Sequence, residues 1–234
     1  MGILDKSAES RAGLHRRLPI AKEGYPFIIS TAMATAIFGF LGWVYLAGIF
    51  CGFTFFVISF FRNPNRTPPS SENTIVSPAD GKILKIENHP EREFLHRDTV
   101  KISIFMSLFD VHVNRSPMTG QVMKRVYSPG KFFAANTDKS SLLNERNILL
   151  LCSNDGFEIL FIQIAGIIAR RIVCYPKQGD FLQRGQIFGM IRFGSRLEVF
   201  LPRGVDIQVR EGDSVRAGET ILGYRNVEKA EDRH

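Results

Sequence analysis

The sequence predicts a mainly β domain with few helices, preceded by an N-terminal transmembrane helical hairpin. Three observations support this prediction: one long apolar run near the N-terminus, a series of short alternating runs after it, and a repeated glycine-aspartate motif. The 234 residues are enough for one well-buried domain plus a modest appendage. We divide them into a cytoplasmic basic segment, a membrane hairpin, a proline-rich connector, a β-rich domain and a polar tail, at 1–24, 25–61, 62–71, 72–225 and 226–234.

The apolar run covers residues 25–61 and contains no Asp, Glu, Lys, Arg or His. One crossing of a hydrocarbon core of about 30 Å takes about 20 residues, so the run is too long for one pass and fits two short ones. Residues 39–43 combine flexible glycines with an interfacial tryptophan, which is typical of a turn between two passes. A pair of buried core helices and a signal peptide are the alternatives, but the run is too uniform for the first and starts too late for the second.

Basic residues flank the apolar run on both sides. The positive-inside tendency therefore places both of its ends, and the β-rich domain, on the cytoplasmic face of the cell (inner) membrane. The net charge of +7 comes without a zinc-finger or ribonucleoprotein pattern, so we expect an anionic membrane surface as partner and no nucleic acid. The residues placed to contact that surface are Arg16, Arg17, Lys22, Arg62 and Arg66.

The cysteines and histidines predict no cross-link and no metal. The three cysteines are far apart and the five histidines are scattered, so the sequence shows neither a disulfide framework nor metal-ligand spacing. We expect free thiols and no metal site.

After the connector, short runs alternate between apolar and polar residues with a period of two, bounded by glycine, proline and asparagine. This pattern predicts half-buried strands. The expected strands lie at 81–87, 100–107, 120–127, 148–152, 157–164, 168–175, 186–192, 196–201 and 205–210.

A seven-residue motif occurs twice, at 179–185 and at 212–218, and both copies read Gly-Asp-x-aliphatic-x-x-Gly. The glycines permit tight turns and the aspartate can accept hydrogen bonds from nearby backbone amides, so each copy predicts a corner between short strands. Such corners resemble those of lipoyl and biotinyl carrier domains. The resemblance implies a barrel-sandwich fold for the β-rich domain.

The dipeptide Gly194-Ser195 joins two of the expected strands. Gly194 has no Cβ, so its carbonyl can be approached closely, and the Ser195 hydroxyl can attack it and convert the amide into an ester. β-Elimination would then leave dehydroalanine, and hydrolysis would convert it into a pyruvoyl group. The alternative is an ordinary turn, because glycine-serine is a common turn dipeptide.

Several strings in register resemble the short form of the phosphatidylserine decarboxylase family. They cover most of the chain and include the Phe-Gly-Ser-Arg string around Ser195. The strings are at 60–66, 77–81, 110–117, 144–147, 165–172 and 193–196.

The resemblance implies a proenzyme that cuts itself between Gly194 and Ser195 into two fragments that remain associated. Ser195 becomes a covalent pyruvoyl cofactor, which replaces pyridoxal phosphate and forms a Schiff base with the substrate amine. The implied reaction converts phosphatidylserine into phosphatidylethanolamine and CO2. A homo-oligomer is possible.

The resemblance also implies residues that assist Ser195. Asp80 matches the acid of the family's Asp-His-Ser set, and a turn-forming aspartate is the alternative. His112 is the expected base, with a buried strand histidine as the alternative. Longer members carry His-x-x-His here, whereas this chain has Arg115 in the second position, so His112 can match the histidine that serves decarboxylation instead.

Arginine and lysine side chains near these motifs are candidates to bind the phosphodiester or carboxylate of the substrate. The candidates are Arg115, Lys131 and Arg146, with Arg170 and Arg171 as further ones. Solvated surface or a structural ion pair is the alternative for each.

Two other functions stay open. One is decarboxylation of another serine-headed lipid, such as an archaeal ether lipid (an archaetidylserine-like substrate). The other is a non-catalytic, membrane-anchored β-sandwich adaptor or lipoyl-type carrier with Lys139 as the modified residue, although the residues around Lys139 do not alternate like strands.

Overall fold

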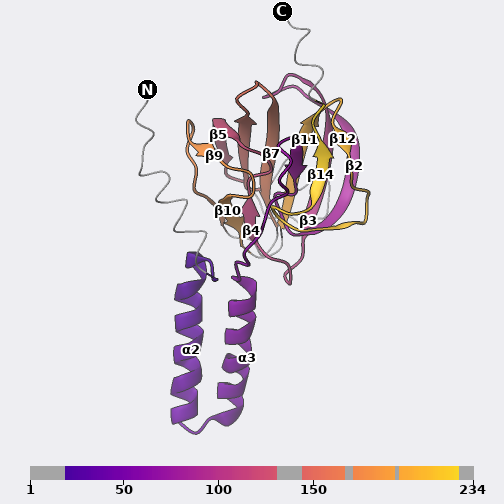
Figure 1. Cartoon of the computed structure of the whole chain (residues 1–234). Helices are drawn as coiled ribbons and strands as arrows, with labels where there is room; N and C mark the ends of the chain where they lie inside the picture. Colours follow the sequence, from indigo (N-terminus) through magenta and orange to yellow (C-terminus); the bar gives the residue numbers. More distant parts are fainter. Residues whose placement is uncertain (1–18, 131–143, 167–170, 193–194, 227–234) are drawn as a thin grey trace, which may run out of the picture. The chain divides into compact units, whose positions relative to one another are not determined.

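The computed structural model describes residues 19–130, 144–166, 171–192 and 195–226. The chain forms two compact units, Met1–Asn65 and Arg66–His234. In the first unit, a short 3-10 helix η1 (Lys22–Gly24) leads into α2 (Tyr25–Phe40), and α3 (Val44–Phe60) runs back beside it (Figure 1). Gly42, with φ of 75°, takes the left-handed conformation in the turn between the helices. Aromatic side chains of the two helices pack together, with the Phe38 and Phe50 rings 5.2 Å apart.

The predicted pair of helices is therefore present, but each helix is short. α2 has 16 residues and α3 has 17. Within the described part of the chain, no helix has the length and apolar content that a complete membrane crossing takes. The prediction of two transmembrane passes is thus not supported by these helices.

The second unit is built of strands, which confirms a mainly β fold with few helices. They are β1 (Thr74–Val76), β2 (Gly81–Glu91), β3 (Arg97–Met106), β4 (Val113–Arg115), β5 (Gly120–Ser128), β6 (Arg146–Cys152), β7 (Glu158–Ala165), β8 (Ile172–Cys174), β9 (Phe181–Leu182), β10 (Ile187–Ile191), β11 (Ser195–Pro202), β12 (Asp206–Ile207), β13 (Ser214–Val215) and β14 (Ile221–Tyr224). Each predicted run overlaps one of them.

Among the described residues, eight strands form one antiparallel sheet in the order β13-β2-β3-β11-β7-β6-β5-β9 (Figure 1). Two smaller sheets have the orders β1-β14-β12 and β4-β10-β8. β11 lies between β3 and β7 and alternates strictly. Leu197, Val199 and Leu201 point into the main hydrophobic core, on what we call the inner face of the large sheet, and Phe200 joins a second cluster on the outer face.

Both copies of the glycine-aspartate motif form corners with the same hydrogen bonds. Asp180 Oδ2 accepts from the Lys177 N–H, and Asp213 Oδ2 accepts from the Arg210 N–H, each at 2.8 Å. The first glycine of each motif has a positive φ, and its N–H donates to the neighbouring long strand, at Val122 O of β5 and Ile83 O of β2. The motif therefore stands at a corner in both places, as the sequence predicts.

The structure shows that the repeat is longer than the motif. Each corner meets a Ser-Pro-x-x-Gly turn, Ser77 to Gly81 in one half and Ser116 to Gly120 in the other. Both serine hydroxyls donate to the carbonyl two residues later, at 2.7 and 2.8 Å. The fourth residue of each turn accepts a backbone N–H from the corner, through Asp80 in the first half and Thr119 in the second.

Candidate active site

Ser195 is the first residue of β11 and lies between two other strands. Its cross-strand partners are Met106 of β3 and Ala165 of β7, and all three residues are fully buried. Because side chains alternate along a strand, Ser195 shares the inner face with Leu197. Its hydroxyl Oγ donates to Met106 Sδ at 3.3 Å. Gly194, the other half of the predicted cleavage site, lies outside the described residues.

Two residues of the 144–147 string hold the strand end that faces Ser195. Asn144 Nδ2 donates to Ala165 O at 2.7 Å, and the Ala165 N–H donates to Glu145 O at 3.0 Å. Ala165 therefore keeps its position beside Ser195 through contacts outside the sheet ladder.

His112 is fully buried just before β4. Its Nδ1 lies 2.9 Å from Asp110 O, and because a carbonyl only accepts, Nδ1 carries the proton. In the neutral ring Nε2 is then the basic nitrogen. The His112 carbonyl also accepts from the Ile191 N–H of β10 at 3.4 Å, so His112 lies next to the strand that leads toward Ser195.

A tight turn ahead of His112 fixes the carbonyl that orients its ring. Asp110 Oδ2 accepts hydrogen bonds from both the N–H and the hydroxyl of Ser107, each at 2.7 Å. The Asp110 N–H donates to Ser107 O at 3.1 Å. The 110–117 string thus supplies both the histidine and the turn that holds it.

Asp80 is 8% exposed and lies directly before β2. Its Oδ1 accepts from the Ala217 N–H at 2.7 Å, and its Oδ2 pairs with the Arg66 guanidinium at 2.8 Å. Arg66 also pairs with Glu219 at 2.7 Å. Since Lys82 of β2 is opposite Phe105 of β3, Asp80 lies at the end of the large sheet where Met106 and Ser195 are found.

Of the predicted substrate-binding residues, Arg115 is 6% exposed and donates from NH1 to Gly185 O at 3.0 Å. Arg171 is exposed next to β8. Lys131, Arg170 and the carrier candidate Lys139 lie outside the described residues. For all of them substrate binding stays a prediction.

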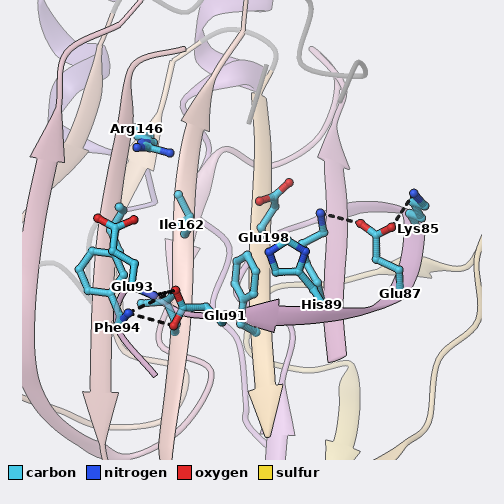
Figure 2. Close-up of a pocket in the computed structure, with 13 residues that line it drawn as sticks. Lys85, Glu87, His89, Glu91, Glu93, Phe94, Arg146, Ile162 and Glu198 are labelled. Atoms are coloured by element: carbon cyan, nitrogen blue, oxygen red, sulfur yellow. Dashed lines mark hydrogen bonds and ion pairs between the residues drawn. The ribbon is translucent and has the colours of Figure 1, made fainter. Parts of the chain in front are cut away.

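Arg146 lies on the other side of the large sheet from the Ser195 side chain. It is in register with Ile164, which is in turn opposite Arg196, so it shares the outer face. There it lines a cavity of about 340 Å³ together with Ile162, Glu198 and charged residues of β2 (Figure 2).

Ion pairs dominate one wall of this cavity. Hydrogen bonds from Lys101 and Lys85 lower the pKa of Glu87 to about 2. The corresponding N–O distances are 2.6 and 2.5 Å. Both ammonium groups thus pair with the same carboxylate.

Sequence reasoning missed a row of buried amides on the inner face. Asn147 Nδ2 donates to Gln163 Oε1 at 3.0 Å, and Gln163 Nε2 donates to Asn114 Oδ1 at 2.9 Å. Asn114 Nδ2 lies 3.7 Å from Met106 Sδ, the sulfur that Ser195 contacts. Asn114 and Asn147 fall within the 110–117 and 144–147 strings. This position in the strings was the one sign in the sequence that they could be functional.

Sequence comparison with known proteins shows the family. The family profile described as phosphatidylserine decarboxylase matches residues 53–223. The chain belongs to this family.

Curated relatives named phosphatidylserine decarboxylase proenzyme support the assignment. The protein of Geotalea uraniireducens is 50% identical over 209 residues, covering 89% of this chain and 98% of the relative. That of Syntrophus aciditrophicus is 52% identical over 206 residues, covering 87% and 96%. The resemblance of the short strings to the phosphatidylserine decarboxylase family is thereby confirmed.

Proposed function

We propose that this chain cuts itself before Ser195 and decarboxylates phosphatidylserine to phosphatidylethanolamine with the pyruvoyl group that results. The observation that carries the proposal is the position of Ser195, a fully buried serine at the first residue of a central strand. A serine there is costly as a purely structural residue, since the acceptor that its hydroxyl meets among the described residues is a thioether sulfur, at 3.3 Å.

The surroundings of Ser195 fit a pyruvoyl group. The carbonyl oxygens of such a group accept hydrogen bonds, and Asn114 Nδ2, a donor, lies 3.7 Å from Met106 Sδ, the same sulfur that the Ser195 hydroxyl contacts. When present, the group supplies an electron sink for the electrons released as the α-carboxylate leaves.

His112 and Asp80 take the proton-handling roles in this proposal. His112 has Nδ1 tied to Asp110 O, so Nε2 is the nitrogen that accepts and returns protons. Asp80 keeps negative charge at the same end of the large sheet, and Arg66 balances that charge. Arg115 in place of a second histidine leaves His112 as the base in both self-cleavage and decarboxylation.

Release of CO2 from phosphatidylserine labelled in the serine carboxylate tests the reaction directly. We expect wild-type protein to release labelled CO2 and Ser195→Ala to release none. Wild-type protein that self-cleaves without releasing label would contradict the choice of lipid. A serine-headed ether lipid assayed in parallel then decides whether another serine-headed lipid is preferred.

We further propose that the α2–α3 hairpin inserts into the membrane from the cytoplasmic side, without both helices having to cross it fully. Its surface is apolar around the turn, where Phe40 is 93% and Tyr45 91% exposed. Exposed apolar patches of this kind mark interaction sites. The acyl chains of a lipid bilayer can cover such a patch and remove it from water.

Flotation with vesicles containing phosphatidylserine tests membrane insertion. We expect Phe40→Asp combined with Val44→Asp to abolish flotation, whereas Met123→Asp, at an exposed side chain of β5, changes nothing. Equal flotation of the hairpin variant and the wild-type protein would contradict the proposal.

A further inference from the structure

The buried amide row runs from β6 through β7 to β4. Asn147 and Gln163 are direct cross-strand partners on the inner face, and Asn114 comes from the middle of β4. All three side chains have zero exposure. The row ends at Met106 Sδ, which lies 3.7 Å from Asn114 Nδ2 and 3.3 Å from Ser195 Oγ.

An arginine sets the direction of every hydrogen bond in this row. Arg125 Nε donates to Asn147 Oδ1 at 3.3 Å, and a guanidinium has only donors. Asn147 must then present Nδ2 to Gln163, Gln163 must present Nε2 to Asn114, and Asn114 must present Nδ2 toward Met106. The amide orientations follow from chemistry, although oxygen and nitrogen are alike in shape.

The donor at the end of the row faces a poor acceptor. A thioether sulfur accepts hydrogen bonds weakly, and a buried N–H without a good partner destabilises the fold. Four residues are thus arranged so that a donor, and never an acceptor, faces the Met106 sulfur that Ser195 contacts. An arrangement of this kind suits an oxygen that gains negative charge during the reaction.

We propose that Asn114 donates a hydrogen bond from Nδ2 to the oxygen that leaves Ser195 during self-cleavage, and that Gln163, Asn147 and Arg125 hold it in the donating orientation. The inference rests on the proposed cleavage before Ser195. It makes Asn114 a catalytic residue of cofactor formation and the other three positioning residues.

The steps of the proposed reaction show that negative charge develops on Ser195 Oγ. In the first step the Gly194 acyl group moves from the Ser195 nitrogen to Oγ, and the hydroxyl proton ends on the freed amine. In the second step a base takes the Cα proton of Ser195, the C–H electron pair forms the Cα=Cβ bond, and the Cβ–Oγ bond breaks. Oγ leaves as part of the Gly194 carboxylate. Water then hydrolyses the resulting enamine, which releases ammonia and leaves the pyruvoyl group.

Asn147→Asp tests the direction of the row. A carboxylate keeps the size of the side chain and pairs with Arg125, but it only accepts, so Gln163 turns to donate to it and Asn114 turns in response. Asn114 then presents Oδ1, in place of Nδ2, toward Met106 and Ser195. We expect spontaneous self-cleavage, followed as conversion of the full chain into two fragments, to slow by about 100-fold.

Hydroxylamine identifies the step that is lost. It attacks esters, so it cuts the chain once the acyl group has moved to Oγ, and the small fragment then begins with an unblocked serine. We expect Asn147→Asp to retain hydroxylamine-dependent cleavage at the wild-type rate while spontaneous cleavage slows. Asn114→Asp, which places an acceptor in the pocket directly, is expected to behave in the same way and decides the question if Asn147→Asp does not fold.

Gln183→Glu is the matched control, because it adds the same charge to an exposed glutamine next to β9. Spontaneous cleavage of both variants at the wild-type rate would overturn the proposal. Loss of hydroxylamine-dependent cleavage in a variant with a wild-type thermal midpoint would also overturn it, since the block would then precede elimination. A wild-type chain that stays uncut under both conditions would instead contradict the proposed function.

Discussion

Asp80 shows how one residue can combine a structural and a chemical role. Its counterpart in the other half of the β unit is Thr119, and both side chains accept a backbone N–H from a corner, at 2.7 and 3.1 Å. A hydroxyl is evidently enough for that contact. The second carboxylate oxygen of Asp80 pairs with Arg66, and this oxygen is not needed to hold the corner.

Asp80→Thr separates the two roles. We expect the β unit to fold, with a loss of about 1–2 kcal/mol of stability for the missing contact to Arg66. Self-cleavage is expected to slow by about 100-fold, because the charge near Ser195 is gone. Thermal unfolding and fragment yield measure the two effects, and wild-type cleavage by this variant would show that Asp80 only caps the corner.

For single residues, the sequence predicted a functional role where the residue lies in a specific string. Ser195 and His112 could be named because the strings around them are specific. Asn114, Gln163 and Met106 could not, since a single amide or thioether is common in any strand and these three meet only through tertiary pairing.

At the scale of elements, β10 positions His112 by pairing with both β4 and β8. Gly189 is opposite Cys174 and allows this close approach, because a Cβ there would lie 2.0 Å from Val173 O. The backbone at Val173 would have to move to make room for any side chain at position 189.

Gly189→Ala is therefore expected to destabilise the protein by about 2–4 kcal/mol and to slow self-cleavage. Chemical denaturation measures the first effect and fragment yield the second. Gly48→Ala in α3, where a Cβ meets nothing within 4 Å, is the control expected to be tolerated. An unchanged denaturation midpoint for Gly189→Ala would contradict the close packing of β10.

The ion pairs on the outer face predict a dependence of stability on pH. Because the folded-state pKa of Glu87 is about 2, below its usual 4.5, the stabilisation is full above pH 4.5 and is lost as the pH falls toward 2. Between pH 4.5 and 2, the Glu87→Gln variant is expected to lose less thermal stability than the Glu93→Gln variant, in which the substitution is at an exposed site. If the thermal stability of both variants falls equally with pH, the Glu87 ion pairs are not the source of the pH dependence.

Alternation predicted the longer strands, and it also predicted runs that contain the short strands β8 and β12. It missed β1, β4, β9, β13 and β14, which have two to four residues and owe their form to neighbouring strands. The face of Arg146 was also not predictable, because it depends on the pairing of β6 with β7 across the chain.

At the scale of the whole molecule, two units of different composition follow each other. The apolar run predicted a pair of helices with a turn within residues 39–43. The helices fill the run from Tyr25 to Phe60 and turn at residues 41–43, which leaves 16 residues for α2 and 17 for α3. The corner motif predicted the β corners but not the longer repeat, whose Ser-Pro-x-x-Gly half differs in its central residues.

The central claim is that the chain converts its own Ser195 into a pyruvoyl group. The intact mass of purified wild-type protein, compared with that of Ser195→Ala, tests this claim most directly. We expect fragments 1–194 and 195–234, the smaller with a pyruvoyl group in place of an amino terminus, and neither fragment in the variant. A single uncut chain from folded wild-type protein would contradict it.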